Sequence, residues 1–223
     1  MSEFAAENAV VVLSGGQDST TCLYWALNRF AEVVAVTFDY GQRHRIELDA
    51  ARRVAAAAGI EQTELPLDTL AALGGNALTD RGIDVPRSGA SGDLPSTFVP
   101  GRNLLFLTLA AAWAWQRDIR HLVTGVAQTD YSGYPDCREE TMVALQRALC
   151  LGLERDIVVH TPLMHRSKKE TVLLARDEGA LPAMALTHTC YEGTRPPCGT
   201  CAACVLRARG FDAAGIADPL LAT

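Results

Sequence analysis

The sequence predicts an α/β protein built on a doubly wound parallel sheet. Two continuous apolar runs, at residues 9–13 and 33–38, are each followed by a polar loop and then by a segment with helical spacing of apolar residues. Runs without alternation are typical of strands buried on both faces, and parallel strands joined through helices have right-handed crossovers. Ligands of such sheets bind beyond the carboxyl ends of the strands. We therefore expect the functional site where the loops after these two runs meet.

The rest of the chain continues the alternation of strands and helices. Further strands are expected at residues 62–67, 121–125 and 157–159. The expected helices cover residues 46–58, 68–73, 103–116, 139–151 and 167–178. Gly59 and Gly179 stand where two of these helices would end. The helix at 103–116 is apolar nearly all round, which predicts that it is buried against the sheet.

Residues 66–101 show little periodicity and contain several glycines and prolines. A stretch of this length without secondary structure is normally a lid or a mobile binding loop. The alternative is a disordered surface insertion, and for residues 74–91 the composition does not separate the two.

Length and composition exclude several classes of protein. The 223 residues suit one domain with an appendage, and we divide them into a nucleotide-binding domain at 1–186 and a C-terminal segment at 187–223 packed on it. The net charge of −6 argues against direct contact with nucleic acid, which needs a basic surface. No apolar run is long enough to span a membrane, and the polar residues 1–7 do not resemble a signal peptide. We therefore expect a cytoplasmic protein without a membrane partner.

The stretch 14–20, Ser-Gly-Gly-Gln-Asp-Ser-Thr, joins the first expected strand to the first helix. Two adjacent glycines let the backbone turn sharply, and a helix N-terminus offers free N–H groups with a positive dipole end. Such a loop is suited to phosphate, although it lacks the Gly-Lys-Ser/Thr ending of a Walker A loop. The alternative is an ordinary glycine-rich turn with a Ser or Asp cap. Nucleotide contacts are predicted for Leu13, Ser14, Gly15, Gly16, Gln17, Asp18, Ser19, Thr20, Thr21, Cys22 and Leu23.

Four of the seven cysteines lie close together near the C-terminus, with the spacing C-x7-C-x2-C-x2-C: Cys190, Cys198, Cys201 and Cys204. Four thiolates this close would repel one another without a cation, and Zn²⁺ accepts four sulfurs in a tetrahedron. Such a site has no open position, so we expect structural zinc. Disulfides are disfavoured in a chain without an export signal, and a redox pair would leave two of these cysteines without a role.

Several motifs occur in a fixed order along the chain. They are residues 14–23, Asp-Tyr-Gly-Gln-Arg-His at 39–44, Val-Pro-Gly-Arg-Asn at 99–103, a loop at 128–138 that contains Ser-Gly-Tyr-Pro-Asp-Cys-Arg, Lys168 with Glu170, and the four-cysteine tail. The first of these resembles the pyrophosphate loop of the ATP pyrophosphatase (PP-loop) superfamily. The whole set resembles the 7-cyano-7-deazaguanine synthase family of queuosine biosynthesis over nearly the full chain. Residues 61–94 and 187–190 depart from the family pattern.

The resemblance implies an ATP-dependent carbon–nitrogen ligase with an adenine nucleotide alpha hydrolase-like fold. ATP would activate the carboxylate of 7-carboxy-7-deazaguanine, ammonia would displace AMP to give an amide, and a second activation would dehydrate the amide to the nitrile. The resemblance also implies ATP, Mg²⁺ and Zn²⁺ as cofactors, free ammonia as the nitrogen donor and a homodimer.

Three residues are predicted to act in catalysis. Asp18 would bind Mg²⁺ or brace the loop, with a simple helix cap as the alternative. The resemblance favours Lys168 for stabilising the leaving pyrophosphate; otherwise it is a solvated lysine at a helix start. Arg102 would pair with the substrate carboxylate or a phosphate, unless it is a surface arginine. No enzyme nucleophile is needed, so catalysis would consist of alignment and charge stabilisation.

The loop at 128–138 supplies hydrogen-bond acceptors and flat rings, which a deazaguanine needs. Substrate contacts are predicted for Asp130, Tyr131, Tyr134, Asp136 and Arg138. The alternative is ordinary turn chemistry, because the same residue types favour turns.

Other functions are compatible with parts of this pattern. A PP-loop ATPase of tRNA thiolation or lysidine-type modification would need a basic face with an RNA-binding module, or a persulfide cysteine pair. A non-enzymatic zinc module would not need an intact phosphate loop together with Lys168. A relative that attaches the same carboxydeazaguanine to another molecule would carry the same motifs.

Overall fold

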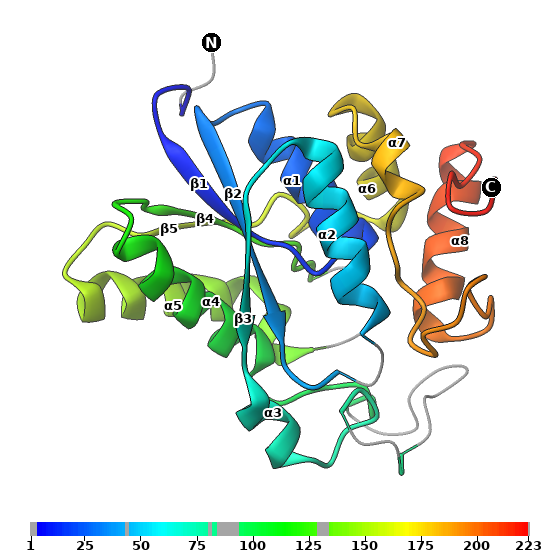
Figure 1. Cartoon of the computed structure of the whole chain (residues 1–223), viewed down its shortest axis with the longest axis horizontal. Helices are drawn as coiled ribbons and strands as arrows, with labels where there is room; N and C mark the ends of the chain where they lie inside the picture. Colours follow the sequence, from blue (N-terminus) through cyan, green and yellow to red (C-terminus); the bar gives the residue numbers. More distant parts are fainter. Residues whose placement is uncertain (1–3, 43–44, 80–81, 84–93, 129–133, 223) are drawn as a thin grey trace.

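A five-stranded parallel sheet in the order β3-β2-β1-β4-β5 forms the centre of the computed structural model (Figure 1). The structure describes residues 4–42, 45–79, 82–83, 94–128 and 134–222. The strands are β1 (Asn8–Val12), β2 (Glu32–Asp39), β3 (Gln62–Pro66), β4 (His121–Val123) and β5 (Val158–His160). The doubly wound α/β fold predicted from the sequence is thereby confirmed.

The helices cover both faces of this sheet. They are α1 (Gln17–Leu27), α2 (Ile46–Ala58), α3 (Asp68–Leu73), α4 (Arg102–Trp115), α5 (Glu139–Leu153), α6 (Lys168–Asp177), α7 (Leu181–Met184) and α8 (Ala202–Ala214), with a 3-10 turn, η1, at Pro135–Cys137. Figure 1 shows α4 and α5 on one face and α1, α2 and α6 on the other. The boundaries of the predicted helices lie within two residues of those observed, whereas α7, α8 and η1 were not predicted.

Strand β1 explains why the first apolar run is continuous. Val11 and Leu13 pack with Leu23 of α1 and Val54 of α2, whereas Val10 packs on the other side of the sheet with the alanines of α4. A strand covered on both faces buries every side chain, so it shows no alternation. Each fully buried valine or leucine contributes roughly 1.5–3 kcal/mol relative to exposure.

Helix α4 differs from its prediction on one side. Leu107 and Ala111 are buried, but Leu105 is 40% exposed and Trp115 is 48% exposed. The apolar character all round the helix therefore does not mean burial all round, and the outer side of α4 presents apolar residues to solvent.

The long segment after β3 is partly ordered by its own side chains. The Asn76 carboxamide oxygen accepts hydrogen bonds from the backbone N–H groups of Leu78 and Thr79, at 3.1 and 3.0 Å. The Ala77 N–H donates to the Ser96 carbonyl at 2.8 Å, which joins the two ends of the segment. These described residues belong to the packed body. The rest of the predicted lid or insertion, residues 80–81 and 84–93, lies outside the described residues.

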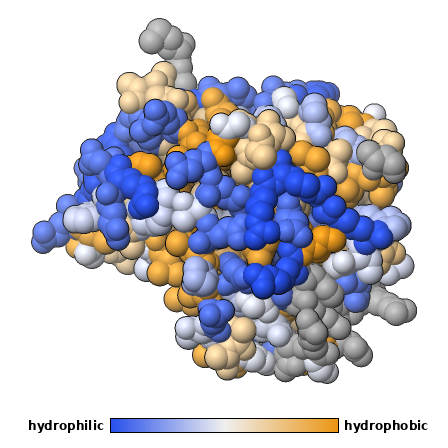
Figure 2. Space-filling model, viewed as in Figure 1, coloured by the Kyte–Doolittle hydropathy of each residue, from blue (hydrophilic) through white to orange (hydrophobic). Residues whose placement is uncertain are grey.

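On the face shown in Figure 2, hydrophilic residues gather over α2, while hydrophobic residues appear in separate groups around it. Helix α2 carries exposed Asp49 and Arg52 on its outer side and buried Ala51 and Val54 on its inner side. Within the described residues, no helix is both long and apolar enough to cross a membrane.

Candidate functional site

A cavity of about 270 Å³ lies at the carboxyl ends of the strands, between the loops that follow β1, β2 and β4. The sheet order places β1 between β2 and β4: the chain runs outward from β1 to β2 and β3 and then returns through α4 to β4, on the other side of β1. Such a switch point is where open α/β sheets bind ligands. The start of α4, the start of α6 and the C-terminal segment complete the wall.

The loop after β1 turns at Gly15, whose φ is 79°. A Cβ at this position would lie 2.5 Å from the Ala51 nitrogen and 2.6 Å from the Glu47 carbonyl oxygen, so the loop packs directly on α2. The Ser14 and Ser19 hydroxyl oxygens are 3.0 Å apart, and the Ser19 hydroxyl donates to the Gly16 carbonyl at 3.2 Å. These bonds fix the loop in a bend that opens onto the N-terminus of α1.

That N-terminus carries polar atoms without partners. Gly16 is the N-cap of α1 and supplies no side-chain cap. Among the described residues, the Gln17 Nε2, Asp18 Oδ1 and Thr20 Oγ1 atoms are buried and make no hydrogen bond. Unsatisfied buried polar atoms are rare, because each one loses its hydration without compensation. Together with the free N–H groups of the first turn they suit an anionic ligand with a metal ion.

Asp18 and Lys168 meet across this end of the sheet. The Lys168 ammonium lies 2.6 Å from Asp18 Oδ2, and both side chains are less than one-third exposed. Lys168 is the first residue of α6, whose N-terminus is fixed by a capping box between Ser167 and Glu170. Gly125, after β4, approaches the backbone of Asp18 so closely that a Cβ there would lie 3.1 Å from its carbonyl carbon. Three separate segments therefore position this ion pair.

The predicted nucleotide-binding residues divide between the cavity and the core. The cavity wall includes Leu13, Ser14, Gly16, Gln17, Asp18 and Ser19. Cys22 and Leu23 instead belong to the hydrophobic core, and burial raises the pKa of the Cys22 thiol well above its usual value. The Thr21 hydroxyl donates to the Gln17 carbonyl within α1, at 2.9 Å.

Arg102 enters the cavity from the start of α4. Its guanidinium carbon lies 5.9 Å from the centre of the Tyr40 ring. Burial raises the pKa of the Tyr40 hydroxyl to about 12, although the charge of Arg102 lowers it. Gly101, with φ of 73°, is the N-cap of α4 and turns the chain into the helix.

The predicted substrate-binding residues are placed differently from one another. Tyr134 lines the cavity, and its hydroxyl oxygen lies 2.6 Å from the Thr97 hydroxyl oxygen. Asp136 is 4% exposed, and its Oδ2 accepts a hydrogen bond from the Asn103 N–H in the first turn of α4 at 3.0 Å. Arg138 is the N-cap of α5. Asp130 and Tyr131 lie outside the described residues.

Glu47 is a cavity residue that the sequence analysis missed. It lies in the first turn of α2, and burial raises the pKa of its carboxyl to about 7, against the lowering effect of Arg102. From sequence it looks like any acidic residue near a helix N-terminus, where the helix dipole favours a negative charge. Its position directly after the loop that follows β2 was the one available signal.

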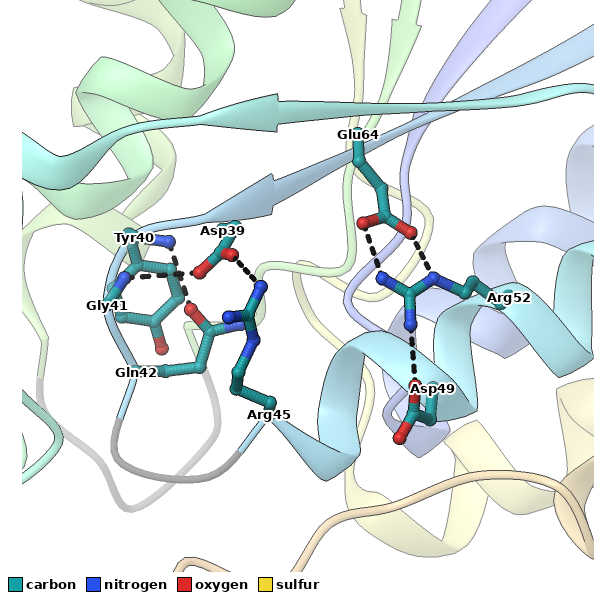
Figure 3. Close-up of polar contacts among 8 residues, drawn as sticks. All are labelled: Asp39, Tyr40, Gly41, Gln42, Arg45, Asp49, Arg52 and Glu64. Atoms are coloured by element: carbon teal, nitrogen blue, oxygen red, sulfur yellow. Dashed lines mark hydrogen bonds and ion pairs between the residues drawn. The ribbon is translucent and has the colours of Figure 1, made fainter.

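The loop before Glu47 is held by its own side chains (Figure 3). The Tyr40 N–H donates to Gln42 Oε1 at 2.9 Å, and Arg45 pairs with Asp39 at 2.7 Å. Farther along α2, Arg52 binds both carboxylate oxygens of Glu64 in β3. The start of α2 is thereby fixed relative to the strand ends.

The four C-terminal cysteines form one cluster whose Sγ atoms all lie within 4.8 Å of one another: Cys190, Cys198, Cys201 and Cys204. The Cys198 and Cys204 sulfurs are 4.0 Å apart, and zinc bonded to sulfur at about 2.3 Å requires sulfurs about 3.8 Å apart. Backbone N–H groups of Cys198 and Cys201 point at neighbouring sulfurs, each at 3.4 Å. The cluster fits a metal ion such as zinc in a closed four-sulfur site.

The C-terminal segment also contacts the loop after β1 and Lys168. The His188 N–H donates to the Gly15 carbonyl at 2.9 Å, and Tyr191 lines the cavity. In α8, Gly210 packs so closely on Lys168 that a Cβ would lie 3.1 Å from the lysine Cβ. Buried Arg207 binds both carboxylate oxygens of Asp218, at 2.6 and 2.8 Å, and this pair fixes α8 to the end of the chain.

Solved structures with a similar fold share little sequence with this chain. A 4-thiouridine synthetase in complex with RNA and ATP has a TM-score of 0.53 at 18% identity, covering 79% of this chain and 42% of that one. The U34-tRNA thiolase NcsA from Methanococcus maripaludis has a TM-score of 0.50 at 18% identity, covering 95% of this chain and 66% of that one. At this identity the likeness shows the fold alone.

Curated relatives are much more similar. A 7-cyano-7-deazaguanine synthase from Laribacter hongkongensis is 67% identical over 217 residues, which cover 96% of this chain and 94% of the relative. The enzyme of the same name from Chromobacterium violaceum is 65% identical over 225 residues, covering 99% and 96%. Residues 8–215 match the family described as queuosine biosynthesis protein QueC. Because the family match covers most of the chain and these relatives are at least 65% identical over nearly its full length, the chain belongs to the QueC family.

Proposed function

We propose that the protein is an ATP-dependent carbon–nitrogen ligase that converts 7-carboxy-7-deazaguanine and ammonia to 7-cyano-7-deazaguanine. The reaction would proceed through an adenylated carboxylate and then an adenylated amide, each formed with release of pyrophosphate. Family membership and the names of the relatives support an enzyme of queuosine biosynthesis. The observation that carries the ATP-dependent chemistry is the set of unpartnered polar atoms beside the Asp18–Lys168 pair.

In this proposal the N-terminus of α1 holds the phosphates of ATP. The N–H groups of the first turn and the hydroxyls of Ser14, Ser19 and Thr20 are the donors. Asp18 Oδ1, which is buried and unpartnered, would hold Mg²⁺, and the ion would neutralise charge on the phosphates. Lys168 stabilises the leaving pyrophosphate from the opposite side, within reach because it already lies 2.6 Å from Asp18.

The substrate ring occupies the part of the cavity bordered by Arg102 and Tyr134. Arg102 pairs with the substrate carboxylate or a phosphate, for which its planar fork is suited. Asp136 supports this arrangement through its bond to the start of α4. Asp130, Tyr131 and Arg138 are retained as candidate substrate contacts that substitution has to test.

Zinc in the four-cysteine cluster has a structural role in this proposal. All four positions of a tetrahedral ion are filled by sulfur, so no position is left for substrate or water. Its function is to fold residues 190–204 and thereby to place Tyr191 and α8 against the cavity.

The proposal is tested by incubating the protein with 7-carboxy-7-deazaguanine, ammonium chloride, Mg²⁺ and ATP, followed by mass analysis. Nitrile, AMP and pyrophosphate are expected, with the amide as an intermediate. Formation of ADP instead of AMP, or consumption of ATP without nitrile, would contradict it. Analytical ultracentrifugation of the same sample tests the homodimer expected from the family.

A tRNA-modifying PP-loop ATPase is the second candidate class, because the structures with a similar fold include a tRNA thiolase. Two observations argue against this class. The net charge of −6 is unfavourable for binding tRNA, and the four C-terminal cysteines lie together in one closed cluster. Unmodified tRNA added in place of the deazaguanine should leave AMP release at background.

A further inference from the structure

Glu47 is a cavity carboxyl that none of these roles uses. It lines the same cavity as Asp18, Lys168 and Arg102. Its backbone packs on the turn of the phosphate loop, since its carbonyl oxygen would lie 2.6 Å from a Cβ at Gly15. The reacting carboxyl of the substrate has to lie beside this loop, because it attacks the innermost phosphorus of ATP. Glu47 therefore belongs to the wall of the cavity in which the proposed reaction takes place.

The state of this carboxyl is unusual. The other carboxylate of the described cavity wall, Asp18, is engaged by Lys168, whereas no hydrogen bond or ion pair within the described part of the chain holds the Glu47 side chain. The ionisable groups that act on it are Arg102 from α4, Tyr40 after β2 and Tyr191 from the C-terminal segment. Burial raises the pKa of Glu47 to about 7, and Arg102 keeps it from rising further. A carboxyl of this kind is half ionised at neutral pH, which is the condition of an efficient general base.

The proposed reaction needs a base at one particular step. Ammonia attacks the adenylated carboxylate through its lone pair, but at neutral pH nearly all of it is present as ammonium, which has none. Lys168 is positively charged and Asp18 is held by it, so neither is suited to remove this proton.

We propose that Glu47 binds ammonium and is the general base that generates ammonia for the amide-forming step, an inference that rests on the proposed function. The Glu47 carboxylate takes one proton from ammonium and becomes a carboxylic acid. The nitrogen lone pair then forms the C–N bond, the bond between the acyl carbon and the AMP oxygen breaks, and AMP leaves with the electron pair. The second proton lost by the nitrogen and the one held by Glu47 pass to solvent.

The test uses Glu47→Gln, which keeps the shape of the side chain and removes the base, with Asp49→Asn as the matched control. Asp49 lies two residues farther along α2 and is exposed. Two half-reactions are measured separately. The first is the burst of pyrophosphate from ATP and 7-carboxy-7-deazaguanine without any amine. The second is transfer of the acyl group to ammonium or to hydroxylamine, which is largely unprotonated at neutral pH and needs no base.

We expect Glu47→Gln to retain the pyrophosphate burst and hydroxamate formation but to form amide from ammonium about 100-fold more slowly or worse. Its amide formation should rise about tenfold per pH unit below the pKa of ammonium, following free ammonia, while the wild type flattens above about pH 7. Asp49→Asn should behave as the wild type in every assay.

Three results would overturn the inference: unchanged ammonium use, equal losses with ammonium and hydroxylamine, or loss of the burst itself, which would assign Glu47 to substrate or ATP binding. If Glu47→Gln does not fold, Glu47→Asp is compared instead, and its preference for hydroxylamine over ammonium should rise relative to the wild type. A wild-type protein that gives no burst would refute the proposed function, which is a different outcome.

Discussion

Asp18 and Lys168 show how much a single contact adds to a motif. Alone, Asp18 is compatible with a helix cap, but the structure makes Gly16 the N-cap and directs one Asp18 oxygen to Lys168. The other oxygen is buried without a partner among the described residues. One carboxylate therefore faces a fixed cation on one side and a potential metal position on the other.

Lys168→Met should lower the pyrophosphate burst by about 100-fold or more, because it removes a fixed positive charge from the leaving group. Lys169→Met is the control, since Lys169 is the adjacent lysine and is exposed. The burst is measured by rapid quench, with circular dichroism to check folding. A burst of normal rate in Lys168→Met would remove this lysine from the mechanism.

We expect the stability of the fold to depend on pH through His160, the last residue of β5. Its Nε2 lies 2.9 Å from His121 Nδ1, and His121 Nε2 lies 2.7 Å from a Glu7 carboxylate oxygen. Burial lowers the pKa of His160 from 6.5 to about 4, helped by His121 and opposed by Glu7. In the unfolded chain the His160 imidazole takes up a proton near its ordinary pKa of 6.5. In the folded chain the imidazole stays neutral until the pH falls to about 4. Stability present above pH 6.5 is therefore lost as the pH falls toward 4.

Because of His160, the free energy of unfolding measured with urea should be about 1–2 kcal/mol lower at pH 5 than at pH 7. The smaller value allows for the partial exposure of the imidazole ring. His160→Asn should flatten the dependence between these pH values. His165→Asn, which changes an exposed histidine, should leave it as in the wild type. An unaltered slope in His160→Asn would assign the effect to other groups.

At the scale of elements, the sequence predicts best those features whose interacting residues lie close together in the chain. Strands β1 and β2 were predictable because burial on both faces leaves a local mark, a continuous apolar run. The cysteine cluster was predictable because its four ligands lie within 15 residues of one another. The role of Asp136 at the start of α4 was not, because its partner Asn103 is 33 residues away.

The packing of the loop after β1 on α2 gives a prediction for Gly15. Gly15→Ala puts a Cβ 2.5 Å from the Ala51 nitrogen, in a backbone conformation with φ of 79°. The loop or α2 must move, so the variant should lose the pyrophosphate burst and unfold at lower urea concentration, by about 2 kcal/mol or more.

Gly152→Ala in α5 is the matched change, because a Cβ there meets nothing within 4 Å and φ is not positive. It should leave activity unchanged and raise the free energy of unfolding by about 0.5–1 kcal/mol. Equal effects of the two substitutions would show that the contact with α2 does not constrain the loop.

For the whole molecule, the cavity depends on residues from both ends of the chain. Glu47 and Tyr191 act on each other electrostatically although they are far apart in sequence. No sequence motif predicts that these two residues lie close together. Glu47 looks like an acidic residue that stabilises a helix N-terminus, and Tyr191 simply follows the predicted metal ligand Cys190. The sequence therefore predicted the cysteine cluster, but not that the segment carrying it lines the cavity beside the loop after β1.

Cys201→Ser should release the metal and weaken the site as well as the fold. Zinc content measured by plasma mass spectrometry should fall below one per chain, and the melting midpoint should fall by about 5 °C or more. The KM for 7-carboxy-7-deazaguanine should rise, because Tyr191 and α8 lose their anchor.

Cys150→Ser is the control, since this thiol lies outside the cluster and hydrogen-bonds to the Ile157 carbonyl. It should keep its full zinc content and an unchanged KM. Normal zinc content in Cys201→Ser would contradict the assignment of the metal to these sulfurs.

The contact of Gly210 in α8 with Lys168 has a consequence for synthesis on the ribosome. A growing chain can form the sheet, the phosphate loop and α6 before α8 has left the exit tunnel, because N-terminal parts fold first during translation. Until then one wall of the pocket is missing and Lys168 lacks the helix that packs against it. A chain that terminates before α8 would therefore leave the ribosome without a complete pocket.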